Sequence, residues 1–347
     1  MRITLIDDSI PFDGSTPRKR SIGGAEKAFV GLSEAFAAKG YEVTAVNRCE
    51  TYCELNGVRW LPFDAPRPPD CEILIAFRRP TLLQEIDDVD QRFLWLWGPL
   101  SFLNKAKHQV LLDRYMPTLI YLGETQRRSW KPNRIYQEAI IVPGVADAYL
   151  DFESDQSEPP PVAITTTHPR HAMQEILRLW VDEIRPNNDH AQLHIYSTSL
   201  SRWRDTGEIG DDFDDLIPMV LKSEKCGVFI KSPMPDSIMA NVYGAAKLHL
   251  YPAIKMEMYG NTLAESQATG LPALVRTTDQ SAGAIAERVC NGQSGYIAPD
   301  DPAFVNLVAE ILAESSGIYR SLHKDALALQ RQRGWRVVAT EFEALWS

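Results

Sequence analysis

Short, almost unbroken apolar runs alternate with stretches of helical apolar spacing along the chain, and this alternation occurs twice. In the first half the runs cover residues 3–6, 42–46, 73–77, 93–97 and 118–122. In the second half they cover residues 162–166, 192–196, 227–230, 248–251 and 273–275. Such runs are typical of parallel strands that helices cover on both faces. The pattern predicts an α/β protein built from two doubly wound sheets.

An acidic segment that ends in three prolines, residues 151–161, separates the two halves and has the composition of a linker. A length of 347 residues also suggests two domains. We therefore expect a first domain over residues 1–150, the linker, and a second domain over residues 162–329. Ligands of doubly wound sheets bind beyond the carboxyl ends of the strands, so we expect a cleft where the two domains face each other.

Helical spacing is clearest between the first two runs, where one face collects Ala25, Ala28, Phe29, Leu32, Ala35 and Phe36 before Gly40. Further helices are expected near residues 171–184, 235–246, 260–269 and 301–314. A last amphipathic helix is expected over residues 327–346, with Trp335, Val338, Phe342 and Leu345 on one face.

Net charge, cysteine content and the length of the apolar runs limit the partners and the cellular compartment that we expect for this chain. The formal net charge of −10 gives no general attraction to nucleic acid or anionic lipid, so we expect no nucleic-acid partner. Five scattered cysteines are typical of reduced thiols in the cytoplasm. No apolar run reaches the length of a membrane-spanning helix, and residues 1–8 do not form a signal peptide. Peripheral contact with a membrane stays open.

Two segments place glycines at the start of a predicted helix. Gly23 and Gly24 open the first helix, where backbone N–H groups favour an anion and Ser21 could cap the helix. The second segment, residues 257–265, follows the run 248–251 and opens a helix at Gly260. It has Glu257 before the helix and Glu265 inside it. A helix N-terminus with a carboxylate on either side suits a diphosphate that carries a sugar at each end.

A third candidate follows the run that opens the second domain, at residues 165–173. Arg170 can bind a phosphate in a bidentate manner, and His171 can do so when protonated. We expect a nearby dianion to raise the pKa of His171. The alternative interpretation is a basic helix start at the surface. The acidic residues 211–215 are interpreted as a solvated helix start, and no metal site is predicted.

The segment from Glu257 to Pro272 resembles the E-x7-E motif of retaining glycosyltransferases of family 4, which have the GT-B fold. Here it has Glu257-Met258-Tyr259-Gly260 and, after three residues, Glu265 followed by Ser266-Gln267-Ala268-Thr269-Gly270-Leu271-Pro272. Residues 23–26, 141–145 and 293–296 resemble further conserved stretches of that family. The resemblance implies that the C-terminal helix, residues 330–347, packs back on the first domain.

The family resemblance also implies roles for individual residues. Glu257 would contact the transferred sugar, and Glu265 the ribose of the nucleotide. The segment Tyr259, Gly260, Asn261, Thr262 and Leu263 would hold phosphate and sugar. Gly23 and Gly24 would lie under the phosphates or the acceptor. His171 stands near the position of the family's lysine, and residues 95–99 lack the histidine that the family usually has there.

The resemblance, together with these residues, implies a metal-independent, retaining hexosyltransferase without a cofactor. The donor would be a nucleoside-diphosphate sugar, with a UDP-sugar slightly favoured. The acceptor hydroxyl would belong to a saccharide, a lipid-linked molecule or another small molecule. Two alternatives stay open. One is an epimerase or hydrolase that acts on the nucleotide-sugar alone. The other is a catalytically degenerate partner protein, which the altered basic residues and the missing histidine support.

Overall fold

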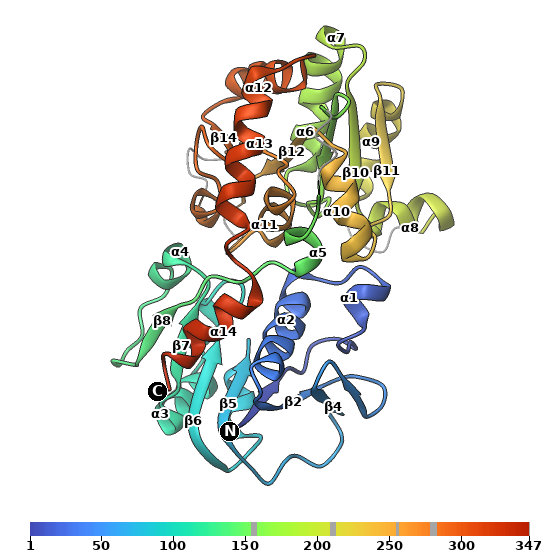
Figure 1. Ribbon diagram of the computed structural model, residues 1–347. Helices are drawn as coiled ribbons and strands as arrows, with labels where there is room; N and C mark the ends of the chain where they lie inside the picture. Colours follow the sequence, from blue (N-terminus) through green and yellow to red (C-terminus); the bar gives the residue numbers. More distant parts are fainter. Residues whose placement is uncertain (154–157, 209–212, 255–256, 278–282, 347) are drawn as a thin grey trace. The chain divides into compact units, whose positions relative to one another are not determined.

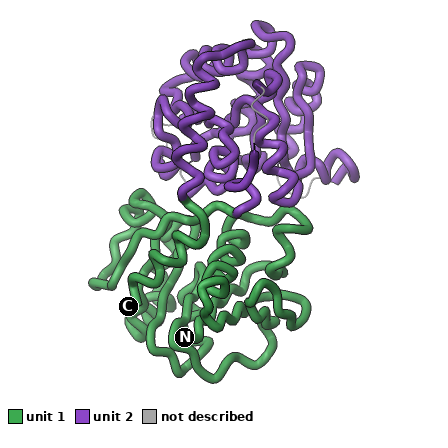
Figure 2. Tube along the Cα trace, in the orientation of Figure 1, with its two compact units in different colours: residues 1–146, 333–347 green, residues 147–332 purple. Residues whose placement is uncertain are grey.

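The computed structural model describes residues 1–153, 158–208, 213–254, 257–277 and 283–346. The chain divides into two compact units (Figure 2). Unit 1 comprises Met1–Ala146 and Arg333–Ser347, and unit 2 comprises Asp147–Gln332. The first boundary lies four residues before the expected end of the first domain. Residues 154–157 of the expected linker lie outside the described residues.

Unit 1 is built on an eight-stranded sheet with the order β3-β4-β2-β1-β5-β6-β7-β8 (Figure 1). All described neighbours are parallel except β3 and β4. The strands are β1 Arg2–Ile6, β2 Glu42–Asn47, β3 Cys53–Leu55, β4 Val58–Pro62, β5 Asp70–Phe77, β6 Asp88–Trp95, β7 Thr118–Tyr121 and β8 Glu138–Ile140. The five apolar runs of the first half correspond to β1, β2, β5, β6 and β7, which confirms the α/β class.

Helices cover the sheet of unit 1, and the longest of them is α2, Gly24–Ala38. Its predicted apolar face is buried at Ala28, Phe29, Leu32, Ala35 and Phe36. The other helical segments are α1 Thr16–Lys19, η1 Pro80–Gln84, η2 Ser101–Asn104, α3 Ala106–Tyr115, α4 Glu124–Arg128 and α14 Trp335–Glu343.

The C-terminal helix α14 packs beside α2. A Cβ atom on Gly31 of α2 would lie 2.4 Å from the indole Nε1 of Trp335. The rings of Phe36 and Phe342 lie 6.0 Å apart with their planes nearly perpendicular. The two helices are therefore in direct contact, although some 300 residues separate them in the sequence.

The prediction of one helix over residues 327–346 is wrong. The chain forms α13, Gly317–Gln330, and α14, with a break between them. Gly334 is the extended N-cap of α14 and pairs with Val145 as an isolated β-bridge. The Arg333 guanidinium bonds to the Val142 carbonyl and to Glu341. These contacts hold Arg333 and Gly334 in a non-helical connection at the boundary between the units. The helix therefore ends before them, and α14 begins after them.

Unit 2 contains a parallel six-stranded sheet with the order β11-β10-β9-β12-β13-β14 among the described residues. The strands are β9 Val162–Thr165, β10 Gln192–Tyr196, β11 Val228–Lys231, β12 Leu248–Pro252, β13 Ala273–Arg276 and β14 Gly295–Ala298. The first five match the predicted runs. The structure therefore confirms two doubly wound α/β units.

The helices of unit 2 bury their apolar faces against this sheet. The four predicted helices appear as α6 Met173–Leu179 with a π-helical turn at Trp180–Ile184, α10 Asp236–Gly244, α11 Asn261–Ala268 and α12 Asp301–Leu312. The remaining helical segments are α5 Asp147–Leu150, α7 Arg185–Asn187, α8 Thr198–Thr206, η4 Asp214–Leu216, α9 Ile217–Glu224, η5 Gly283–Glu287 and α13. The core of the unit includes Trp180, Leu193, Leu250 and Phe304, all fully buried.

Candidate functional site

The strands β9 and β12 lie side by side at the centre of the second sheet, and the strand order reverses between them. From β9 the chain proceeds to β10 and β11 on one side, and from β12 to β13 and β14 on the other. Ligands of doubly wound sheets bind beyond the carboxyl ends of the strands at such a reversal. The loop with Arg170 and His171 follows β9, and the loop with Glu257 follows β12. The predicted site residues of the second half therefore share one sheet edge within unit 2.

Glu257 is held in place by hydrogen bonds in the loop that opens α11. The backbone N–H of Gly260 donates to its Oε1 over 3.0 Å, and the Tyr251 hydroxyl donates to its Oε2 over 3.2 Å. Gly260 is the N-cap of α11 and has a φ of 76°, a left-handed conformation that favours glycine. This glycine lets the loop turn sharply enough for Glu257 to stand beside the positive end of α11.

The other members of the segment lie on the first turn of α11 or next to it. Tyr259 is buried and its ring lies under the Arg288 guanidinium, 4.7 Å from the ring centroid. Leu263 is fully buried in a small apolar cluster with Tyr251 and Ile285. Asn261 and Thr262 are partly exposed at the helix start. The segment therefore has buried side chains that pack within the unit and polar side chains that are partly exposed at the sheet edge.

Glu265 lies farther along α11 and only 7% of it is exposed. Burial, and next the charge of Glu265, raises the pKa of both Tyr149 and Tyr243 well above its usual value. The Tyr149 hydroxyl donates to Oδ1 of Asp236 over 2.8 Å. Glu265 and Asp236 therefore belong to one buried acidic cluster, which α5, α10 and α11 form together. Sequence reasoning missed Tyr149 and Asp236, since only folding brings these helices together.

A buried polar chain connects the loop after β9 with α11. The Thr166 hydroxyl bonds to the Thr262 hydroxyl over 2.9 Å and to Nε2 of His249 over 3.1 Å. Nδ1 of His249 lies 2.8 Å from the Ser266 hydroxyl. His249 is fully buried in β12, and burial lowers its pKa to about 3. It is therefore neutral at pH 7 and can donate one hydrogen bond and accept another. The sequence signal that could have revealed this polar chain is the presence of a histidine inside the apolar run 248–251.

Arg170 and His171 precede α6, which begins two residues later than predicted, at Met173. Arg170 is exposed and His171 is half-buried, with its ring 5.4 Å from that of His168. Burial, and then the neighbouring His168, lowers the pKa of His171, whereas the charge of Glu257 raises it. The hydrogen bond between Thr166 and Thr262 joins the loop of His171 to the start of α11, where Glu257 lies. The predicted rise of this pKa near a dianion stays a prediction.

Gly23 and Gly24 lie at the start of α2 in unit 1, and Gly23 is the N-cap. The suggestion that Ser21 caps this helix is wrong, because the helix begins at Gly24. Gly23 has an ordinary φ of −63°, but a Cβ atom there would lie 2.2 Å from Oε2 of Glu26. The glycine therefore leaves room for the Glu26 carboxylate over the helix start.

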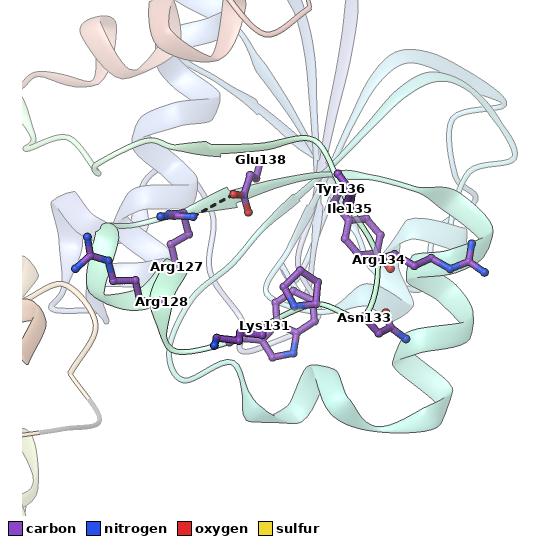
Figure 3. A pocket seen from close by; sticks show the side chains of 10 residues that line it. Arg127, Arg128, Lys131, Asn133, Arg134, Ile135, Tyr136 and Glu138 are labelled. Atoms are coloured by element: carbon purple, nitrogen blue, oxygen red, sulfur yellow. Dashed lines mark hydrogen bonds and ion pairs between the residues drawn. The ribbon is translucent and has the colours of Figure 1, made fainter.

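A pocket of about 580 Å³ lies in unit 1 around α4 and the chain that leads into β8 (Figure 3). Arg127 and Arg128 at its rim are paired with Glu124, and Arg134 is paired with Asp113. None of the predicted site residues lines this pocket. Its cations are largely neutralised, so we assign no ligand to it.

Among the described residues, no group of three or more His, Cys, Asp or Glu side chains could hold a metal ion. Residues 211 and 212 of the acidic stretch lie outside the described residues, and Asp214 and Asp215 begin η4. No helix in the described part of the chain is long and apolar enough to span a membrane.

No family model and no curated protein matches the sequence. Solved structures match it over nearly their whole length. Sucrose-phosphate synthase from Thermosynechococcus elongatus has a TM-score of 0.72 at 15% identity, covering 99% of this chain and 98% of that chain. HepE from Anabaena, in complex with UDP-glucose, has a TM-score of 0.71 at 12% identity, covering 100% and 99%. A glycosyltransferase from Rickettsia africae has a TM-score of 0.70 at 10% identity, covering 99% and 97%. The chain has the GT-B fold of these proteins.

Proposed function

We propose that this chain is a retaining glycosyltransferase, similar to family 4, that moves a hexose from a nucleoside-diphosphate sugar to an acceptor hydroxyl. The observation that carries this proposal is the arrangement at the carboxyl ends of β9 and β12. There, a left-handed glycine opens α11 next to an oriented carboxylate, Glu257, and a loop with Arg170 and His171 stands at the same edge. The similarity of the fold to HepE in complex with UDP-glucose supports a nucleotide-sugar as the donor.

Each group at this edge has a part in donor binding. The diphosphate binds at the positive end of α11, beside residues 260–263, and Arg170 and His171 pair with its oxygens. Glu257 accepts hydrogen bonds from hydroxyls of the transferred sugar. Glu265, in the acidic cluster with Asp236, accepts hydrogen bonds from the ribose hydroxyls. The buried side chain of Tyr259 stabilises this segment through its packing.

The reaction breaks the bond between the anomeric carbon and the leaving diphosphate oxygen, and forms a bond from that carbon to the acceptor oxygen. In the retaining course the acceptor attacks from the side on which the diphosphate leaves. A diphosphate oxygen then takes the acceptor's hydroxyl proton, so no separate base is required. Arg170, protonated His171 and the α11 dipole stabilise the negative charge that develops on the diphosphate. These groups replace the metal ion in that role.

A calorimetric titration of the full chain with UDP, GDP, ADP, CMP and dTDP, in magnesium and in EDTA, tests donor binding. We expect one diphosphate, UDP, to bind with equal affinity in both buffers. Dependence of its affinity on magnesium would contradict the metal-free site, and absence of binding to any of the five would support the degenerate alternative.

Incubation with the matching UDP-sugar and a panel of acceptors then tests the reaction. Proton NMR of the product should show the same anomeric configuration as the donor. An inverted product would refute the retaining course. Consumption of the donor without a new glycoside, even with acceptors present, would support the epimerase or hydrolase alternative.

A further inference from the structure

The first sheet contains a second reversal of strand order, between β1 and β5. From β1 the chain proceeds to β2 on one side, and β5 to β8 follow on the other side. The carboxyl end of β1 carries Asp7 and Asp8, and that of β5 carries Arg78. The start of α2 lies at the same edge, because Arg78 bonds to Glu26 in its first turn. The sheet rule therefore predicts a ligand here too.

Asp7 is a buried carboxylate, and one of its two oxygens accepts no hydrogen bond. It is fully buried, and its Oδ2 accepts a hydrogen bond from the Ser9 hydroxyl. Its Oδ1 has no hydrogen-bond partner in the structure, and Nε of Arg78 lies 4.0 Å away, too far for a hydrogen bond. Burial raises the pKa of Asp7, and the charge of Arg78 opposes this only in part. Buried polar atoms are normally satisfied, so this oxygen lacks a hydrogen bond that the folded chain itself does not supply.

Arg78 is held in a strained backbone conformation. Its φ is 70°, in the left-handed region, and the N–H of Arg79 bonds back to the Phe77 carbonyl over 2.8 Å in a three-residue turn. Its guanidinium bonds to Glu26 and lies over the ring of Phe77, while its Nε has no hydrogen-bond partner. Backbone strain of this kind is concentrated at functional sites.

Trp97 brings a second donor to this edge. It follows β6, the neighbour of β5, and its ring lies 5.5 Å from that of Phe77. Its indole Nε1 is buried and has no hydrogen-bond partner in the structure. Oδ1 of Asp8 is a further buried acceptor without a partner. One sheet edge thus presents two carboxylate oxygens and two N–H groups whose hydrogen bonds are missing.

We propose that Asp7, Asp8, Arg78 and Trp97 bind an uncharged, hydroxyl-rich acceptor, namely a neutral sugar. The inference rests on the proposed function and names the acceptor class for it. A sugar hydroxyl both donates and accepts, so neighbouring hydroxyls can satisfy the carboxylates and the N–H groups together.

The local charges disfavour an acidic acceptor. Arg78 is shared between Glu26 and Asp7, and Arg79 is paired with Asp8 over 3.0 Å, so the group has one more carboxylate than guanidinium. A sugar phosphate would have to approach this carboxylate with no unengaged arginine in the group to neutralise it. The site therefore discriminates against phosphorylated sugars.

The variant Asp7→Asn tests the assignment, with Asp90→Asn, on an exposed part of β6, as the matched control. Titrations by saturation-transfer NMR use glucose, mannose, galactose and their 6-phosphates, with the full chain saturated with UDP. We expect at least one neutral hexose to bind and its 6-phosphate to bind at least tenfold more weakly. Asp7→Asn should weaken the hexose at least tenfold, and the control should not. The melting temperature of Asp7→Asn should not fall, because the substitution removes a buried charge that is only partly compensated.

A purely structural role for Asp7 predicts the opposite result, a lower melting temperature with unchanged hexose affinity, and that result would overturn the inference. Tighter binding of the 6-phosphates, or no binding of any hexose while UDP binds, would also overturn it. If UDP does not bind, the titrations use the diphosphate that calorimetry identifies, and failure of every nucleoside diphosphate to bind would instead refute the proposed function. If Asp7→Asn does not fold, Trp97→Phe takes its place, since it removes only the indole N–H. It should weaken the hexose severalfold, and an unchanged affinity would contradict the assignment.

Discussion

Substitution of Gly260 by alanine should lower both the stability of unit 2 and its affinity for the donor. The expected loss of stability can be worked out from the structure. Gly260 has a φ of 76°, and an alanine there costs about 1–2 kcal/mol of strain. The new Cβ atom would also lie 2.8 Å from Cδ1 of Ile285, which adds about 1–2 kcal/mol of overpacking. We expect a total loss of about 2–4 kcal/mol in the free energy of unfolding of unit 2.

Gly207 offers a matched control. It ends α8 with a φ of 75°, and a Cβ atom there would meet nothing within 4 Å. Alanine at this position should cost only the strain, about 1–2 kcal/mol. Both free energies can be measured by denaturant unfolding that is followed by the fluorescence of Trp180 and its neighbours.

Titration with UDP-glucose separates the two variants. Movement of residue 260 displaces the N–H that donates to Glu257 and the first turn of α11, so we expect Gly260→Ala to bind the donor at least tenfold more weakly. Gly207→Ala should bind it like the wild type. Equal donor affinity of the two variants would refute the assignment of α11 as the diphosphate site.

Two further predictions concern histidines of this site. Burial lowers the pKa of His171, so it must take up a proton to pair with a diphosphate, and UDP-glucose affinity should rise as the pH falls from 8 to 6. Calorimetry should find a rise of at most about tenfold per pH unit. The rise should be absent in His171→Lys, because the lysine stays charged over this pH range. An unchanged pH dependence in that variant would exclude His171 from the phosphate contacts. His249 has a folded-state pKa of about 3, below its unfolded value, so its stabilising effect is present at neutral pH and is lost as the pH falls below about 6.5. Urea unfolding at pH 7 and pH 5 should show a smaller acid loss in His249→Gln than in the wild type, and an equal loss would contradict burial of a neutral imidazole.

The central strands could be predicted because each is an unbroken apolar run that is buried on both faces. The strands β3, β4, β8 and β14 could not be predicted in the same way. They are short and partly exposed, as at Cys53–Leu55 and Glu138–Ile140, so their sequences carry no comparable signal. The break before α14 depends on Arg333 bonding to Val142, a contact that local helical spacing cannot reveal.

The candidate site shows the same division. Glu257, Gly260 and Glu265 belong to one continuous segment, and a segment can be interpreted from its own residues. His249 and Asp236 acquire their places only through contacts with Thr166 and Tyr149, which are distant in the sequence. Long-range hydrogen bonds therefore decide the part of the site that sequence reasoning missed.

Comparison of Glu257→Gln with the wild type tests the central claim most directly. Two quantities are measured on the full chain, the affinity for UDP and the rate of UDP release from UDP-glucose with a saturating acceptor. An exposed residue of α12 provides the control Glu310→Gln. If Glu257 acts on the transferred sugar, its variant should bind UDP within about threefold of the wild type while turnover falls by about 10²–10³. Turnover equal to that of the wild type and the control would contradict the role of Glu257 and the proposed transferase site with it.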